Sequence, residues 1–279
     1  MTTRTAGATG AIDLVEFMAL HDLWTAASPA TRAALGLICE RREHLLVVGV
    51  AATPRVPMLN RVMGVGQGDW DADLFREAQA LLHGRGCVCQ VSLRDGAPAA
   101  GRIRADLARL GYAEDYAWMK FVHRDAPPPG ADRPAPLVRV ARCSRAGRGS
   151  AGHVLAAGFG LPAAFAGVWE EVVGRDRWHC YVARTPDGAP AGVGALFVDG
   201  DAAWLGLGAT LPEARGRGAQ SELLRVRVEE ARRMGCALIV TETGERVDGR
   251  PSGSYRNILR AGFAEHGLRP NLTSPPPGP

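Results

Sequence analysis

The sequence predicts an α/β (α+β) protein built from two tandem halves. Strand-like and helix-like segments alternate through both halves of its 279 residues. The proline-rich segment 125–136 lies between them and has the composition of a stiff linker. The halves also share short sequences in the same order, because 84–91 resembles 234–240 and 107–112 resembles 258–263. An internal duplication explains both repeats.

Hydrophobic periodicity predicts the elements of the first half. The aliphatic run Leu45–Val50 is its clearest strand, and Asp71 provides an N-cap for a helix. In order, we expect helices at 12–26 and 30–42, strands at 44–52 and 58–65, a helix at 71–83, a strand at 87–93, a helix at 101–110 and a strand at 118–123.

Turn sequences separate the elements of the second half. Thr185-Pro-Asp-Gly188 ends one strand, and Asp199-Gly-Asp201 joins two strands in a hairpin. In order, we expect a strand at 137–143, helices at 151–158 and 163–173, strands at 178–184, 191–198 and 203–210, a helix at 219–233, a strand at 236–243, a helix at 254–261 and a strand at 263–269.

The most informative segment of the chain runs from Leu205 to Gly235. An apolar strand leads into the loop Arg215-Gly-Arg-Gly218, which opens directly into a helix. The first N–H groups of a helix lack intrahelical partners and lie at the positive end of its dipole. Glycines let a ligand approach the main chain, and the arginines add positive charge. The segment predicts a phosphate site, although it is neither a P-loop nor a three-glycine dinucleotide motif.

This loop resembles the pyrophosphate loop of the GNAT superfamily of acyl-CoA-dependent N-acyltransferases, which follows the pattern Arg/Gln-x-x-Gly-x-Gly/Ala. Arg215 and Gly218 match that pattern, whereas Gln220 departs from its last position. In the same superfamily the second helix after the loop ends in Gly-Phe, and Gly262 and Phe263 stand at that place here. Both signatures occur in the family's order and separation.

With the duplication, the resemblance implies two tandem GNAT-like domains, each a mixed, mostly antiparallel sheet flanked by helices. The expected limits are a degenerate domain at 1–124, a linker at 125–136, an acyl-CoA-binding domain at 137–272 and a disordered tail at 273–279. The first copy is degenerate because its loop, Gly64–Asp71, contains no arginine, and its aspartates would repel a pyrophosphate. We expect the first half to pack against the second and to shape the substrate cleft.

The resemblance implies direct transfer of an acetyl group from acetyl-CoA, or of another acyl group from its CoA thioester, to the amine of a small molecule. The pantetheine arm would bond to the main chain at the end of a strand, and the pyrophosphate would lie over the loop. The residues implied in cofactor binding are Gly208, Ala209, Thr210, Arg215, Gly216, Arg217, Gly218, Ala219, Gln220 and Asn257.

The attacking amine must be unprotonated, so a base or a water chain is needed beside it. Glu242, at the far end of the strand after the loop helix, and Glu213, beside the loop, are the candidates. Glu170 and Glu171 lie on the helix that borders the acceptor site in this family and are candidates for binding a cationic acceptor. Each of these carboxylates is equally compatible with a solvated surface position.

The family's usual acid for the leaving thiolate is a tyrosine four residues before the Gly-Phe glycine. That position is Ile258 in this chain. Tyr255 lies three residues earlier, about one helical turn along the same face, and is the substitute candidate. The alternative for Tyr255 is a packing role at the start of the helix.

Composition argues against several other classes. The six cysteines are scattered, and Cys87 and Cys89 are too close for the usual zinc spacing, so no metal site is expected. A net charge of +4 with 6% aromatic residues lacks the basic, aromatic footprint of nucleic-acid binding. The sequence contains no apolar run long enough to span a bilayer and no signal peptide, which favours a cytoplasmic protein. Monomer and homodimer both remain open.

Two other functions remain alternatives. Gln220 and Ile258 depart from the family pattern, which is compatible with a non-catalytic acyl-CoA-binding or regulatory protein on the same fold. The loop alone is also compatible with a nucleotide-phosphate-binding module.

Overall fold

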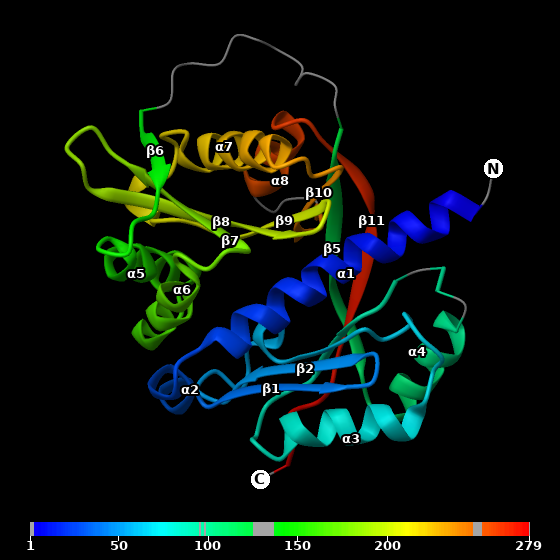
Figure 1. The fold of residues 1–279 in the computed structure, drawn as a ribbon. Helices are drawn as coiled ribbons and strands as arrows, with labels where there is room; N and C mark the ends of the chain where they lie inside the picture. Colours follow the sequence, from blue (N-terminus) through cyan, green and yellow to red (C-terminus); the bar gives the residue numbers. More distant parts are fainter. Residues whose placement is uncertain (1–2, 95, 98, 125–136, 248–252, 279) are drawn as a thin grey trace. The chain divides into compact units, whose positions relative to one another are not determined.

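The computed structural model of the chain describes residues 3–94, 96, 97, 99–124, 137–247 and 253–278 (Figure 1). The expected linker, 125–136, lies outside the described residues. None of the helices within these ranges is long and apolar enough to cross a bilayer.

The chain forms two compact units. Unit 1 comprises Met1–Thr25, Pro29–Met119 and Gly267–Pro279, and unit 2 comprises Ala26–Ser28 and Lys120–His266. This grouping differs from the expected domain limits, because residues 267–279 belong with the first unit. The reason is that strands β5 (Ala113–His123) and β11 (Phe263–Thr273) each begin in one unit and end in the other. The expected limits themselves remain predictions.

Unit 1 contains a mixed sheet with helices packed on it. Its strands are ordered β1-β2-β3-β4-β11, and all neighbours are antiparallel except β3 and β4, which are parallel. Its complete elements are α1 (Thr3–Ala26), α2 (Pro29–Leu35), β1 (Leu37–Arg42), β2 (Leu45–Val50), η1 (Pro57–Leu59), β3 (Arg61–Met63), α3 (Ala72–His83), β4 (Gln90–Ser92) and α4 (Ala100–Arg109).

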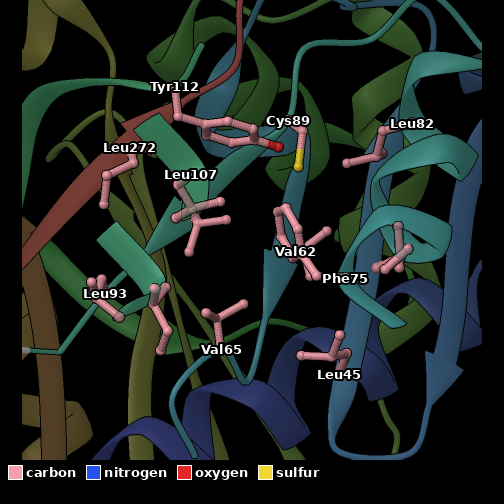
Figure 2. Close-up of a cluster of buried hydrophobic side chains, with 14 of the residues drawn as sticks. Leu45, Val62, Val65, Phe75, Leu82, Cys89, Leu93, Leu107, Tyr112 and Leu272 are labelled. Atoms are coloured by element: carbon pink, nitrogen blue, oxygen red, sulfur yellow. The ribbon is translucent and has the colours of Figure 1, made fainter. Parts of the chain in front are cut away.

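The core of unit 1 fills the space between its sheet and helices α3 and α4. Figure 2 shows apolar side chains from these elements converging, with the Tyr112 phenol directed towards the Cys89 thiol. Burial raises the pKa of the Cys89 thiol to about 12, so the thiol is neutral. The fully buried members include Val47, Phe75, Ala78, Leu82, Val91, Ile103 and Leu107.

The expected helix at 30–42 is wrong in its second half. Helix α2 ends at Leu35, and Gly36 follows with a φ of 57°. Residues 37–42 instead form β1, whose six residues pair in antiparallel register with β2, from Leu37↔Val50 to Arg42↔Leu45. A left-handed glycine ends the helix, and pairing with a distant strand then outweighs the local helical spacing.

The end of the chain also differs from expectation. Thr273 is the last residue of β11 and pairs with Gln90. Ser274, expected in a disordered tail, is 4% exposed. Its Oγ accepts a hydrogen bond from the Cys89 N–H at 2.9 Å, and its own N–H donates to the Cys89 carbonyl at 2.8 Å. The start of the tail is therefore buried and hydrogen-bonded to Cys89, the residue before β4.

The strands of unit 2 also form a mixed arrangement, which helices cover on both faces. Its strands are ordered β5-β10-β9-β8-β7-β6, with β6 to β9 antiparallel and β9 parallel to β10. Helices α7 and α8 lie on one face and α5 and α6 on the other (Figure 1). Its complete elements are β6 (Arg139–Arg142), α5 (Arg148–Phe159), η2 (Ala163–Phe165), α6 (Ala166–Val172), β7 (Trp178–Arg184), β8 (Pro190–Asp199), β9 (Ala202–Thr210), η3 (Pro212–Ala214), α7 (Ala219–Arg233), β10 (Leu238–Gly244) and α8 (Gly253–Arg260).

Candidate functional site

Strands β9 and β10 pair over only part of their length. Their parallel register runs from Ala202↔Leu238 to Leu205↔Thr241, where the Thr241 hydroxyl also donates to the Leu205 carbonyl at 2.8 Å. β10 continues to Gly244, and β9 stays paired with β8 as far as Thr210. Beyond Leu205, one edge of the β9 main chain is therefore no longer in register with β10.

A β-bulge interrupts β9 in this open stretch. Val193 pairs with Ala209 and Ala195 with Gly206, so Gly194 of β8 faces two residues of β9, Leu207 and Gly208. Leu207 has a φ of 49°, which is unusual for a residue with a branched side chain. Bulges and left-handed non-glycine residues carry a conformational cost and are common beside functional sites.

The loop before α7 ends in a helix start without a side-chain cap. Gly216 and Gly218 have φ values of 77° and 82°, and Gly218 is the N-cap residue. Arg215 and Arg217 are exposed on the same loop. The first N–H groups of α7 therefore have no side-chain cap, and two exposed arginines lie on the loop before them, which is compatible with the predicted anion site.

Gln220, the residue that departs from the family pattern, connects α7 to α8. Its Nε2 donates to the Ser254 Oγ at 2.9 Å, and its Oε1 accepts a hydrogen bond from the Asn257 Nδ2 at 2.8 Å. Asn257 was expected to bond to the pantetheine amides, and in the structure its side chain bonds to Gln220. The two residues are thus brought together at the start of α7.

Tyr255 is buried and bonded to a carboxylate. It is 3% exposed, and its hydroxyl donates to the Glu265 Oε1 at 2.6 Å. Its ring meets that of Phe121 edge to face, with the centroids 4.9 Å apart. Burial, and next the hydrogen bond to Glu265, raise the pKa of Tyr255 to about 12. Tyr255 therefore keeps its proton at neutral pH. The family's tyrosine position, Ile258, is also buried, at 3% exposed.

Glu242 forms a partly buried ion pair. The Lys120 Nζ of β5 donates to the Glu242 Oε2, and the two side chains are 6% and 15% exposed. Lys120 and Phe121 are consecutive in a strand and point to opposite faces of the sheet. Because Phe121 contacts Tyr255, the two candidate catalytic residues Glu242 and Tyr255 lie on opposite faces.

The other candidate carboxylates, Glu213, Glu170 and Glu171, also belong to unit 2. Glu213 is exposed in η3. Glu170, on α6, pairs with Arg148 of α5 at 3.8 Å, whereas Glu171 beside it is partly buried.

Sequence reasoning missed one residue of this region, Arg227. It is 3% exposed on α7, among the buried Leu223, Leu224, Val228 and Ala231. The signal was present, because an arginine at position 227 falls in the apolar stripe of the predicted helix 219–233.

Comparisons with known proteins agree with this geometry. Residues 158–249, which include the loop, match the model of the acetyltransferase (GNAT) family. Among solved structures, a GCN5-related N-acetyltransferase from Sphaerobacter thermophilus is 15% identical with a TM-score of 0.60, over 84% of this chain and 81% of that chain. A GCN5-related N-acetyltransferase from Kribbella flavida is 16% identical with a TM-score of 0.57, over 89% of this chain and 95% of that chain.

A tandem GNAT protein from the clavulanic acid biosynthesis pathway is also similar. It is 18% identical with a TM-score of 0.57, over 84% of this chain and 79% of that chain. Among curated proteins, none matches the sequence significantly. At these identities the likeness to solved structures shows the fold, and the expected tandem arrangement of the fold is confirmed.

Proposed function

Because residues 158–249 match the GNAT acetyltransferase family model and the fold is similar to that of a tandem GNAT protein, we propose that the chain transfers an acetyl group from acetyl-CoA to the amine of a small molecule. The observation that carries the proposal is the uncapped start of α7 beside the open edge of β9. Bound there, acetyl-CoA supplies an acyl group on a sulfur leaving group.

The residues of the loop suit a pyrophosphate. Arg215 and Arg217 provide two guanidinium groups, and the first N–H groups of α7 provide hydrogen-bond donors at the positive end of the helix. The left-handed Gly216 and Gly218 let the main chain approach the oxygens closely. We assign anion binding to Arg215–Gln220 on these grounds.

The open edge of β9 suits an amide-containing arm. Main-chain groups of Gly208, Ala209 and Thr210 can extend the ladder onto the pantetheine amides, as an added strand would. The bulge at Leu207 and Gly208 turns main-chain groups out of the regular ladder, where a fixed N–H can stabilise the negative charge that develops on the thioester oxygen.

Proton transfer falls to residues at the ends of β10 and α8. Glu242 is our candidate base, and Lys120 holds its carboxylate in place. Tyr255 is our candidate acid for the sulfur. It lies on the opposite face of the sheet from Glu242, so the two residues would act from the two sides of the open edge of β9, and Tyr255 must first give up its hydrogen bond to Glu265. The same hydrogen bond, with Ile258 at the family's tyrosine position, favours the second candidate function, a non-catalytic acyl-CoA-binding protein.

Thiol release separates these two functions. Acetyl-CoA is incubated with the protein and a panel of amines, and free CoA is measured. We expect amine-dependent release that Glu242→Gln and Tyr255→Phe each reduce by at least about a hundredfold, the usual contribution of acid–base groups. Tight binding of acetyl-CoA without turnover on any amine supports the non-catalytic function instead.

The loop assignment has a matched pair of variants. Gly218 and Gly235 stand at the two ends of α7, and both have a φ of 82°. Gly218→Val should abolish acetyl-CoA binding in calorimetry, because its side chain occupies the place of the phosphate oxygens. Gly235→Val imposes the same backbone strain away from the loop and should leave binding intact. Equal affinities in the two variants would refute the loop assignment.

A further inference from the structure

Arg227 is a charged residue buried behind the bulge of β9. Its Nε donates to the Leu223 carbonyl of its own helix at 2.9 Å. Its Nη1 donates to the carbonyls of Ala195 and Gly206, at 2.9 Å and 3.1 Å. Ala195 and Gly206 are the paired residues at one end of the bulge. The guanidinium therefore ties α7 to both strands where their register shifts.

Glycines make room for this guanidinium. A Cβ on Gly194, the β8 residue that faces the bulge, would lie 2.7 Å from the Arg227 Cζ. A Cβ on Gly208 would lie 3.7 Å from its Nη2. At Gly206 a Cβ would lie 1.9 Å from the Trp204 ring, so a side chain is excluded there too. The small residues of the bulge leave space that the arginine fills.

The charge of Arg227 is not neutralised by a carboxylate. Within the described part of the chain all its hydrogen bonds end on main-chain carbonyls. The titratable side chains next to it, Cys180 and Tyr181 of β7, are neutral because burial raises the pKa of both, that of Tyr181 to about 12. Burial lowers the pKa of Arg227 to about 10, so it remains protonated at neutral pH.

Burying a cation without a carboxylate partner costs free energy of folding. If position 227 served packing alone, an apolar side chain would fill the space without that cost. We propose that Arg227 is a positioning residue that fixes the bulge and lends positive charge to the sulfur of the bound acyl donor. This inference rests on the proposed function, which places the thioester at the bulge. In the transfer, the amine nitrogen bonds to the acyl carbon and loses a proton to a base, while the C–S bond breaks and its electron pair leaves on sulfur. A nearby cation stabilises that thiolate.

Because the acceptor is unidentified, the test uses CoA and desulfo-CoA as ligands. Their dissociation constants are measured by calorimetry from about pH 6 to about pH 9, which spans the ordinary thiol pKa of about 8.5 while Arg227 stays protonated. For the unchanged protein, the affinity for CoA relative to desulfo-CoA should rise about tenfold across this range, which corresponds to a thiol pKa lowered by about one unit.

Arg227→Met should abolish this rise, and Arg227→Lys, which keeps the charge, should retain part of it. Arg225→Met is the control, because Arg225 lies two residues away on the exposed face of α7 in ion pairs with Glu222 and Glu229. If Arg227→Met does not fold, Gly194→Ala, whose methyl group displaces the guanidinium, replaces it. A rise that persists in the folded Arg227 or Gly194 variant overturns the inference, as does equal weakening of both ligands without a pH effect. A protein that binds neither CoA nor acetyl-CoA fails the proposed function itself.

Discussion

Helices α3 and α7 begin after similar loops, in units 1 and 2 respectively, but their first turns differ. Each helix follows a glycine-containing loop and leads into a strand parallel to the one before the loop. At α3, the Asp71 Oδ1 accepts hydrogen bonds from the N–H groups of Asp73 and Leu74, at 2.8 Å and 3.1 Å. At α7, Gly218 has no side chain to do so. A carboxylate caps the first helix start, whereas the second has no side-chain cap, which fits the external anion that we propose there.

The buried arginines of the two units also differ, in the groups that they bind. In unit 1, Arg61 of β3 pairs with Glu16 of α1 at 3.3 Å, and Arg269 of β11 pairs with Asp13 at 3.0 Å. In unit 2, Arg227 bonds to main-chain carbonyls. Unit 1 pairs Arg61 and Arg269 with carboxylates. Unit 2 pairs its buried Lys120 with Glu242, but its buried Arg227, within the described part of the structure, bonds only to main-chain carbonyls beside the open strand.

The largest expected effect is on the free energy of unfolding and comes from breaking the buried Glu16–Arg61 ion pair of unit 1. Glu16→Gln should destabilise the protein by about 3–5 kcal/mol, because it leaves the Arg61 charge buried without its counter-charge. Adding Arg61→Met should recover much of that loss. The exposed pair of Glu40 and Arg42 is the control, and Glu40→Gln should change stability by at most about 1 kcal/mol. Urea unfolding measures all three, and equal losses for Glu16→Gln and Glu40→Gln would remove the contrast.

Replacing Gly218 with aspartate should give α7 a carboxylate at its N-cap, as Asp71 does for α3. Gly218→Asp places a carboxylate where the anion binds, and aspartate tolerates the left-handed backbone there better than most residues. We expect acetyl-CoA affinity to fall on the order of a hundredfold, equivalent to about 3 kcal/mol of charge-assisted hydrogen bonds. Gly218→Asn has the same shape without the charge and should lose less. Similar affinities for both variants would show that shape, and not charge, decides binding.

The smallest effect concerns the cap of α3 and depends on pH. Hydrogen bonds from the N–H groups of Leu74 and Asp73 lower the pKa of Asp71 in the folded protein. The ionised Asp71 therefore stabilises the folded protein fully above its unfolded-state pKa of about 3.9. This stabilisation is lost as the pH falls through the lower pKa of Asp71 in the folded state.

Asp71→Ala should accordingly lower the Tm at neutral pH, and the difference from the unchanged protein should disappear in acid. Thermal unfolding followed by circular dichroism at several pH values measures it. Asp69→Ala, in the exposed part of the same loop, is the control. A Tm difference that persists at low pH would mean that Asp71 acts through something other than its charge.

Helices and strands were predicted correctly from the sequence where the residues that end them lie beside them in the chain. β7 at Trp178–Arg184 and α7 at Ala219–Arg233 match the expected ranges, because turn residues and glycines flank them in sequence. β1 was mistaken for the continuation of a helix, because its partner β2 and the turn at Gly36 decide its conformation. The burial of Ser274 likewise depends on contacts with Cys89, far away in sequence.

The same distinction between local and distant contacts decides which parts of the candidate site could be predicted. The proposed anion-binding loop is contiguous, so its glycines and arginines could be read directly from the sequence. The partners of Tyr255 and Glu242 could not, because Glu265 and Lys120 come from other strands. The position of Arg227 in the apolar stripe of its helix could be read from the sequence, but its contacts could not, because they depend on space left by glycines in two strands.

The central claim is that the chain has one acyl-CoA site, at the start of α7. Titration calorimetry of acetyl-CoA into the unchanged protein and into Gly218→Asp tests it most directly. We expect a stoichiometry of one acetyl-CoA per chain for the unchanged protein and an affinity on the order of a hundredfold lower in the variant. A stoichiometry of two, or binding that survives Gly218→Asp with its affinity unchanged, would contradict the account.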